Sequence, residues 1–366
     1  DAELNFYRFN NAAVHRGAHK LAEEATENFE NSRSIVAEFL GGKSDEIVFT
    51  KSATESINLV AYALTEKVKP GDRIVVSEME HHANLIPWQQ LAKRTGAELA
   101  WFEVTPEGRL DLSKIEEVIT ANTTLVAITH QSNVLGTINP LEKIVARASA
   151  VGAEVLVDAC QSVPHMAVDV KKLGVDYLAF SGHKALGPTG VGVLWGRNLE
   201  ALPPFLFGGS MIENVTMTEA TWAPAPKKFE AGVPNMAQAI GLAAALKYLN
   251  QIGLTAIHEH ELYLTKALLA GLADISGVNV FGPKDTFERG GTVSFTLDGI
   301  HPHDLGQFLD SKGVAVRTGH HCAWPLARKF KVQATTRASL YLYNDLSDVD
   351  ALLSGVIDAK KFFLER

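Results

Sequence analysis

The sequence predicts an α/β protein with a large domain on a mostly parallel, seven-stranded sheet, followed by a smaller α+β domain. Three observations support this prediction. Short β-branched or apolar runs alternate with helical stretches up to about residue 200, this alternation then fades, and the last 100 residues mix strands and helices differently. Because strands that alternate with helices pair in parallel, the sheet should be covered on both faces.

The elements of the large domain follow in order. A first helix is expected over 17–40, where Leu21, Ala25 and Phe29 recur near the helical period and Gly41 follows the run. The expected strands cover 46–50, 73–77, 99–104, 125–129, 154–158, 176–180 and 191–195. The expected crossover helices cover 54–66, 83–95, 111–120 and 140–151.

The second half of the chain is organised differently. A long irregular stretch from about residue 200 to 235 precedes two apolar helices, over 236–252 and 255–275. The remaining expected strands lie near 277–281, 291–297, 313–317 and 338–343, and the remaining helices near 303–312 and 346–364. We therefore divide the chain into a large domain over 17–255 and a small domain made of 256–366 together with the N-terminal segment 1–16.

Composition narrows the class of protein. The chain has 366 residues, 46% of them hydrophobic and 21% charged, with a net charge of −8 and no basic stripe, so nucleic acid is not an expected partner. No apolar run approaches the roughly 20 residues that span a bilayer. Only two cysteines are present, which favours a reducing compartment. A cytoplasmic location is expected; since the chain begins with Asp1, an organellar stroma or matrix stays open.

One of the two cysteines has an unusual neighbourhood. Cys322 lies in the segment 317–325, Arg-Thr-Gly-His-His-Cys-Ala-Trp-Pro, where imidazoles and a guanidinium surround the thiol. Such surroundings can favour a reactive thiolate. A free cysteine is also commonly a small buried hydrophobe, and this segment alone leaves both interpretations open.

Three further sites follow one another along the chain and could bind one cofactor. Ser52 to Glu55 open a helix after a strand, where backbone N–H groups bind phosphate, although an ordinary helix cap fits equally. Asp158 ends a buried strand and requires a cationic partner, either a ring nitrogen or a surface lysine. Lys184 follows the next strand in a Gly/Ser-flanked turn and could form a Schiff base or remain solvated. Together the set provides handles for the phosphate, ring nitrogen and aldehyde of pyridoxal 5′-phosphate (PLP).

Two more residues fit this interpretation. His81 follows a strand and could stack on a planar ring, and Arg337 enters a strand of the small domain and could bind a carboxylate in bidentate fashion. A zinc site from His81, His320 and Cys322 is a rival interpretation.

The motifs resemble the class V aminotransferase group of fold-type I PLP enzymes, and specifically the SufS-type (group II) cysteine desulfurases. The resemblance runs essentially end to end. The segments that carry it are His15-Arg16-Gly17, Ala53 to Asn58, Glu80-His81-His82-Ala83-Asn84, Ser132 to Gly136, Asp158 to Gln161, Ser181-Gly182-His183-Lys184, Phe229 to Gly232 and Arg317 to Cys322.

The resemblance implies a role for each site residue. Lys184 would hold PLP, Cys322 would accept sulfur and His81 would stack on the ring. The remaining PLP contacts would come from Asp158 at the ring nitrogen, Gln161 and Asn133 at O3′, and Thr54, Ser181 and His183 at the phosphate. The substrate carboxylate would meet Arg337 with Asn133 nearby, and His15 and Arg16 would reach the site of a partner subunit. Arg317, His321 or the substrate itself could favour the thiolate of Cys322.

The implied activity is conversion of L-cysteine to L-alanine with a persulfide left on Cys322, in a homodimer that passes sulfur to a SufE- or SufU-like protein for iron–sulfur cluster assembly or other sulfur transfer. A selenocysteine lyase on the same scaffold, a PLP aminotransferase without sulfur chemistry and a non-enzymatic thiol/histidine metal or sulfur-relay scaffold are the alternatives. The chain departs from the family pattern at Ala53, Val233 and Trp324, and at Cys160, which we expect to be a buried hydrophobe.

Overall fold

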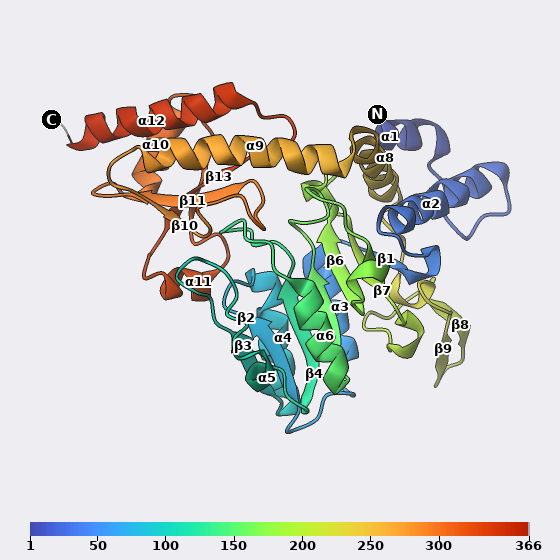
Figure 1. Cartoon of the computed structure of the whole chain (residues 1–366). Coiled ribbons are helices and arrows are strands. Elements are labelled where there is room, and N and C mark those ends of the chain that lie inside the picture. The colour runs from blue at the N-terminus through green and yellow to red at the C-terminus, as the bar shows by residue number, and fades with distance from the viewer. Residues whose placement is uncertain (365–366) are drawn as a thin grey trace.

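The computed structural model describes residues 1–364, and its large domain is built on a seven-stranded sheet (Figure 1). The strand order is β1–β7–β6–β5–β4–β2–β3. The strands are β1 (Ile47–Thr50), β2 (Arg73–Ser77), β3 (Glu98–Phe102), β4 (Thr123–Thr129), β5 (Glu154–Asp158), β6 (Tyr177–Ser181) and β7 (Gly192–Gly196). Every neighbouring pair from β3 to β6 is parallel, whereas β7 is antiparallel to both β6 and β1. The predicted mostly parallel, seven-stranded sheet is therefore confirmed.

Both faces of this sheet are buried, as its apolar strands require. Along β4, Val126 and Ile128 join the core cluster on one face, while Leu125 and Ala127 join the cluster on the other. The covering helices are α2 (Lys20–Phe39), α3 (Ala53–Ala63), α4 (Ile86–Thr95), α5 (Ile115–Val118), α6 (Leu141–Val151) and α7 (Val170–Leu173). The helix expected over 111–120 is thus reduced to the short α5, and the helix expected over 83–95 begins with a separate 3₁₀ turn at His82–Asn84.

The C-terminal part forms a second core around a four-stranded antiparallel sheet, in the order β10–β11–β13–β12. Its strands are β10 (Val278–Phe281), β11 (Thr292–Leu297), β12 (Arg317–Gly319) and β13 (Thr335–Ser339). Its helices are α9 (Leu254–Ala273), α10 (Pro302–Asp310), α11 (Trp324–Lys329) and α12 (Leu346–Leu364). Figure 1 shows α9 running from the large domain along this sheet.

Two strand predictions in this part were displaced. The strand expected at 313–317 is β12, which begins at Arg317 because Gly313, with a φ of 81°, belongs to the turn that follows α10. The strand expected at 338–343 is β13, which ends at Ser339 because the chain turns at Tyr341, whose N–H donates to Asn344 Oδ1. Sequence periodicity also missed α11, which has only six residues.

The N-terminal segment lies against helices of the large domain. It forms α1 (Ala2–Asn5) and a π-helical turn (Phe6–Asn10), and Phe6 and Val14 pack with residues of α2 and α8 (Met236–Ile252). The sequence-based division groups residues 1–16 with the C-terminal part; the contacts of Phe6 and Val14 are with α2 and α8, and the division itself stays a prediction. Within residues 1–364 no single helix is long and apolar enough to cross a membrane; only α8 and α9 taken together meet that test, with a 73° bend between them.

A small hairpin interrupts the stretch that we expected to be irregular. Strands β8 (Ile212–Val215) and β9 (Ala220–Trp222) pair only with each other and project from the large domain (Figure 1). All seven residues of the two strands are exposed. The residues of these two strands therefore contribute exposed surface and do not join a hydrophobic core.

Candidate active site

The functional residues predicted from sequence meet at the carboxyl edge of the large sheet, under the small domain. β5 ends at Asp158 and β6 at Ser181, and parallel strands deliver their carboxyl ends to one edge. One cavity there is lined by Thr54, His81, Asn133, Asp158, Gln161, Ser181, His183, Lys184, Arg317, Cys322 and Arg337. Residues more than 260 positions apart in the chain thus face one space.

Two predicted residues lie elsewhere in this chain. His15 lines a different cavity, where its Nε2 is 3.0 Å from Glu30 Oε1, and Arg16 donates to Ser210 Oγ. The expectation was that they complete the site of a partner subunit, so their role stays a prediction.

The first turn of α3 forms one end of the cavity. Ser52 is the N-cap residue, but its side chain makes no capping hydrogen bond, so the capping interpretation has no hydrogen bond to support it. Instead, the N–H of Ala53 donates to Ser181 Oγ at 2.9 Å. Gly192 on β7 allows this approach, because a Cβ there would lie 2.5 Å from the Ser52 backbone. Unpaired N–H groups and hydroxyls at this helix end suit a phosphate.

The centre of the cavity holds an acid and an amine from adjacent strand ends. Asp158 is only 5% exposed, and its Oδ1 accepts the Cys160 N–H at 3.0 Å. Lys184 follows β6 in a 3₁₀ turn, and within residues 1–364 its amine has no hydrogen-bond or ion-pair partner. Cys160 is buried, as predicted, and burial raises the pKa of its thiol to about 12, so the thiol stays protonated at neutral pH.

His81 is held in the cavity as a neutral ring. Burial and the nearby Lys184 lower its pKa to about 4, although Asp158 opposes the shift. Its Nδ1 accepts the Ala83 N–H at 3.1 Å, so the proton lies on Nε2. A neutral imidazole with a fixed tautomer can stack on an aromatic ring and donate from Nε2.

The residue before His81 anchors this segment. Glu80 is fully buried, and its carboxyl group accepts from Ser77 Oγ, the Thr129 N–H and Asn84 Nδ2 at 2.6–3.0 Å. Burial raises its pKa to about 8, although these three hydrogen bonds oppose the shift. Glu80 therefore ties the segment to β2 and β4.

The small domain supplies a positively charged group to the cavity. Arg337 on β13 donates from Nη1 to the Asn133 carbonyl at 2.9 Å, and its buried Nε has no partner within the described residues. Burial, followed by repulsion from Arg317, lowers its pKa to about 10, so it stays charged at neutral pH. A half-buried cation with a buried donor that has no partner among residues 1–364 is suited to a carboxylate.

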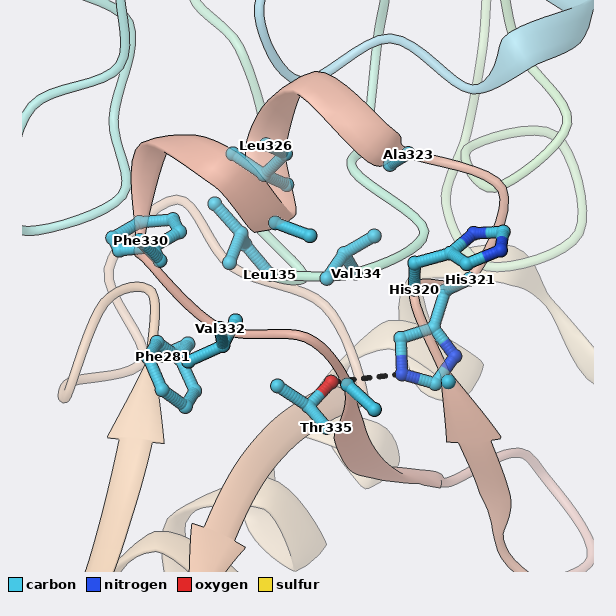
Figure 2. A pocket seen from close by; sticks show the side chains of 13 residues that line it. Val134, Leu135, Phe281, His320, His321, Ala323, Leu326, Phe330, Val332 and Thr335 are labelled. Atoms are coloured by element: carbon cyan, nitrogen blue, oxygen red, sulfur yellow. Dashed lines mark hydrogen bonds between the residues drawn. The ribbon is translucent and has the colours of Figure 1, made fainter. Parts of the chain in front are cut away.

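Cys322 lies on a loop between β12 and α11, which we call the nucleophile loop (residues 320–324). Its thiol is partly exposed and is 4.0 Å from Arg317 Nη2. His321 lines both the active-site cavity and a small, largely apolar cavity beside it, and its ring Nε2 pairs with Thr335 Oγ1 at 2.8 Å (Figure 2). Burial and Arg337 lower the pKa of His321 to about 3, so this ring is neutral. Of the two protein groups that the sequence left open as partners of the thiolate, beside the substrate itself, only Arg317 can supply positive charge.

The sequence alternatives can now be weighed against this arrangement. Within residues 1–364, no group of three or more His, Cys, Asp and Glu side chains is arranged to hold a metal ion. The residues do fit PLP: a helix N-terminus for phosphate, a buried carboxylate for the ring nitrogen and an unpaired lysine for the aldehyde share one cavity. This fold and site are those of a PLP-dependent enzyme.

The chain belongs to the aminotransferase class-V family, whose model matches residues 1–352. It is 53% identical over 371 aligned positions to a probable cysteine desulfurase 2 of Mycobacterium leprae, covering 99% of this chain and 88% of that protein. Its fold matches the apo structure of a cysteine desulfurase from Thermococcus onnurineus with a TM-score of 0.96 at 44% identity, over 99% and 90% of the two chains. A C-DES mutant with glycine covalently linked to its PLP cofactor matches with a TM-score of 0.84 at 25% identity, over 98% and 92%.

Two residues of the site carried no assigned role in the sequence. Glu80 and His82 flank His81 in the sequence. No periodic pattern or chemical motif there shows that Glu80 is buried and anchors the segment, or that His82 contacts a distant loop. The charged identity of Glu80 just after an apolar strand was the only available signal. The contacts of His82 depend on a loop 240 residues further along the chain.

Proposed function

We propose that this protein is a cysteine desulfurase, which converts L-cysteine to L-alanine and retains the sulfur on Cys322 as a persulfide. One observation carries the proposal: the partly exposed Cys322 thiol and the unpaired Lys184 amine line the same cavity. An aminotransferase requires the lysine but has no use for a thiol beside it.

Each side chain has a task in this reaction. Arg337 binds the substrate carboxylate through its free Nε and thereby fixes the direction of the amino acid in the cavity. Lys184 moves the Cα proton, since its amine has no competing partner among residues 1–364. PLP, when bound, supplies the electron sink that makes this proton removable. Asp158 would hold the ring nitrogen, and neutral His81 would cover the ring face.

The sulfur step balances without an external oxidant. The thiolate of Cys322 attacks the substrate sulfur, so an S–S bond forms and the Cβ–Sγ bond breaks. The electron pair of the broken bond stays on carbon, which takes up a proton and becomes the methyl group of alanine. Arg317, next to Cys322 Sγ, stabilises the attacking anion.

Mass spectrometry of the holoenzyme after L-cysteine treatment tests the proposal. We expect alanine together with a gain of one sulfur on the peptide that contains Cys322, and loss of both in Cys322→Ser. Alanine from the wild type with an unmodified peptide would contradict the mechanism. No alanine would instead point to an aminotransferase, and retained selenocysteine cleavage by Cys322→Ser would point to a selenocysteine lyase.

We also propose a homodimer. Apolar side chains that a monomer would leave in water gather on the hairpin β8–β9 and the segments beside it, including Phe207 at 62% exposed, Met217 at 99% and Val233 at 72%. Exposed apolar groups of this kind mark association surfaces. His15 and Arg16, near Ser210, adjoin this region and could reach a partner's site.

The persulfide requires a further acceptor. Because Cys322 is partly exposed, a SufE- or SufU-like carrier could collect the sulfur for iron–sulfur cluster assembly or other sulfur transfer. Both cysteines are free thiols, which supports our proposal of a reducing, cytoplasmic location. Sulfur labelled in L-cysteine should appear on such a carrier only when Cys322 is present.

A further inference from the structure

The nucleophile loop holds its thiol in an unfavourable backbone conformation. His321 and Cys322 have φ values of 53° and 58°, two consecutive non-glycine residues in the left-handed region. Such residues persist only where surrounding contacts fix them. The contacts of the loop therefore determine where the thiol points.

One residue of the large domain, His82, makes two hydrogen bonds to the loop, one at Cys322 and one just after it. The backbone N–H of His82 donates to the Cys322 carbonyl at 2.7 Å. The ring Nε2 of the same residue accepts the Trp324 N–H at 3.0 Å. His82 therefore satisfies two polar backbone groups of the loop, which are 240 or more positions away in the chain.

The ring can accept that hydrogen bond because it is neutral. Burial, followed by the neighbouring His320, lowers the pKa of His82. The titratable groups that face it are His81 on its own segment and His320 on the loop, whose ring centroids lie 6.4 Å and 5.7 Å away. His320 also stacks on Trp324 at 4.6 Å and accepts the Cys322 N–H at 3.2 Å, so the loop packs against His82 as one unit.

The same short segment is hydrogen-bonded to the large sheet and lines the active-site cavity. Glu80 anchors it to β2 and β4, and His81 lines the cavity. His82 thus fixes the position of the loop relative to the segment 80–82, in which His81 would cover the PLP ring. The distance between thiol and substrate would then be set by three consecutive residues.

We propose that His82 is a positioning residue, whose imidazole holds the nucleophile loop so that Cys322 faces the substrate cavity. This inference rests on the proposed function, since it assigns Cys322 as the attacking thiol. It concerns how the loop is held, and its test therefore includes measurements that need no turnover.

The test compares His82→Leu, which cannot accept a hydrogen bond, with His82→Gln, whose amide oxygen can. In the holoenzyme we expect His82→Leu to lower kcat for alanine formation by roughly 10–100-fold with little change in KM, because the thiol is misplaced while substrate binding is intact. Amide exchange at 322–324 should speed up about tenfold or more. His82→Gln should restore both to within about threefold of wild type.

His301→Leu is the matched control. His301 also accepts a backbone N–H, from His303 at 3.2 Å, but at the start of α10. The His301→Leu variant should leave amide hydrogen exchange at residues 322–324 unchanged. Unchanged exchange in His82→Leu, or equal losses in His82→Leu and His82→Gln, would overturn the inference.

If His82→Leu does not fold, His82→Asn replaces it, since its shorter side chain leaves the Trp324 N–H out of reach. The alkylation rate of Cys322 by iodoacetamide gives a readout independent of the reaction, and we expect it to change in His82→Asn and to recover in His82→Gln. An unchanged rate in His82→Asn would overturn the inference. If L-cysteine gives no persulfide in the wild type, the proposed function fails, whereas the exchange and alkylation results still decide the role of His82.

Discussion

At the scale of single residues, the site contains several groups whose pKa values burial moves away from their usual range. His81 and His321 are neutral, Arg337 keeps its charge, and Glu80 holds a proton beyond its ordinary range. In each case burial is the largest cause. The exclusion of water from these side chains therefore sets the protonation states that the proposed chemistry needs.

Arg337→Lys tests the carboxylate contact. Lysine keeps the positive charge but loses the planar fork and the free Nε donor. We expect KM for L-cysteine to rise roughly tenfold or more, with kcat within about threefold, in steady-state alanine assays. Arg328→Lys, at an exposed position on α11, is the control and should change neither value. A fall in kcat at constant KM would assign Arg337 to the chemical step instead.

Glu80→Gln tests the buried carboxyl group. The unfolded chain loses this proton near pH 4.5, whereas the folded protein holds it to about pH 8. The stability that Glu80 contributes is therefore complete below pH 4.5 and is lost as pH rises toward about 8, by up to about 1.4 kcal/mol per pH unit. Urea unfolding from pH 5 to 8 should show this decline in the wild type and a flatter profile in the variant. Parallel profiles would contradict the raised pKa.

At the scale of elements, the close approach of β7 to the first turn of α3 shapes the end of the cavity that we expect to bind phosphate. Gly192→Ala would place a Cβ 2.5 Å from the Ser52 backbone, which cannot rotate away. We expect a loss of about 1–3 kcal/mol in the free energy of unfolding. PLP should also bind more weakly, as measured by fluorescence titration.

Gly208→Ala is the control for that substitution, because its Cβ would meet only the Ala231 side chain at 3.8 Å. It should leave both stability and PLP affinity unchanged. Equal effects at the two glycines would indicate a general cost of the methyl group.

Elements also differ in how well the sequence predicts them. The strands β2, β4, β5 and β6 were predicted because each is a short apolar run between helices, and burial on both faces produces that pattern directly. β12 and β13 were displaced, since a half-covered antiparallel sheet leaves a weaker pattern and its turns decide the bounds. The hairpin β8–β9 was missed because its exposed residues carry no core signal.

At the scale of the whole molecule, the apolar surface around β8–β9 predicts association. Phe207→Glu combined with Met217→Glu should convert a dimer into a monomer in light scattering, because two buried carboxylates per subunit would oppose contact. Phe287→Glu is the control, at an exposed phenylalanine that packs against Arg109 and does not belong to the hairpin. A monomeric wild type, or a double variant that stays dimeric, would contradict the proposed homodimer.

The sequence by itself determined the α/β class, the order of strands and helices, and which side chains carry chemistry, because these follow from local apolar patterns and from residue types such as Lys184, Asp158 and Cys322. Only the tertiary structure decided which of them meet. It placed Arg317 beside the thiol, turned His321 toward Thr335 and brought His82 to the nucleophile loop. Such contacts join residues far apart in the chain, and burial then sets their charge, so no local pattern of residues can contain them.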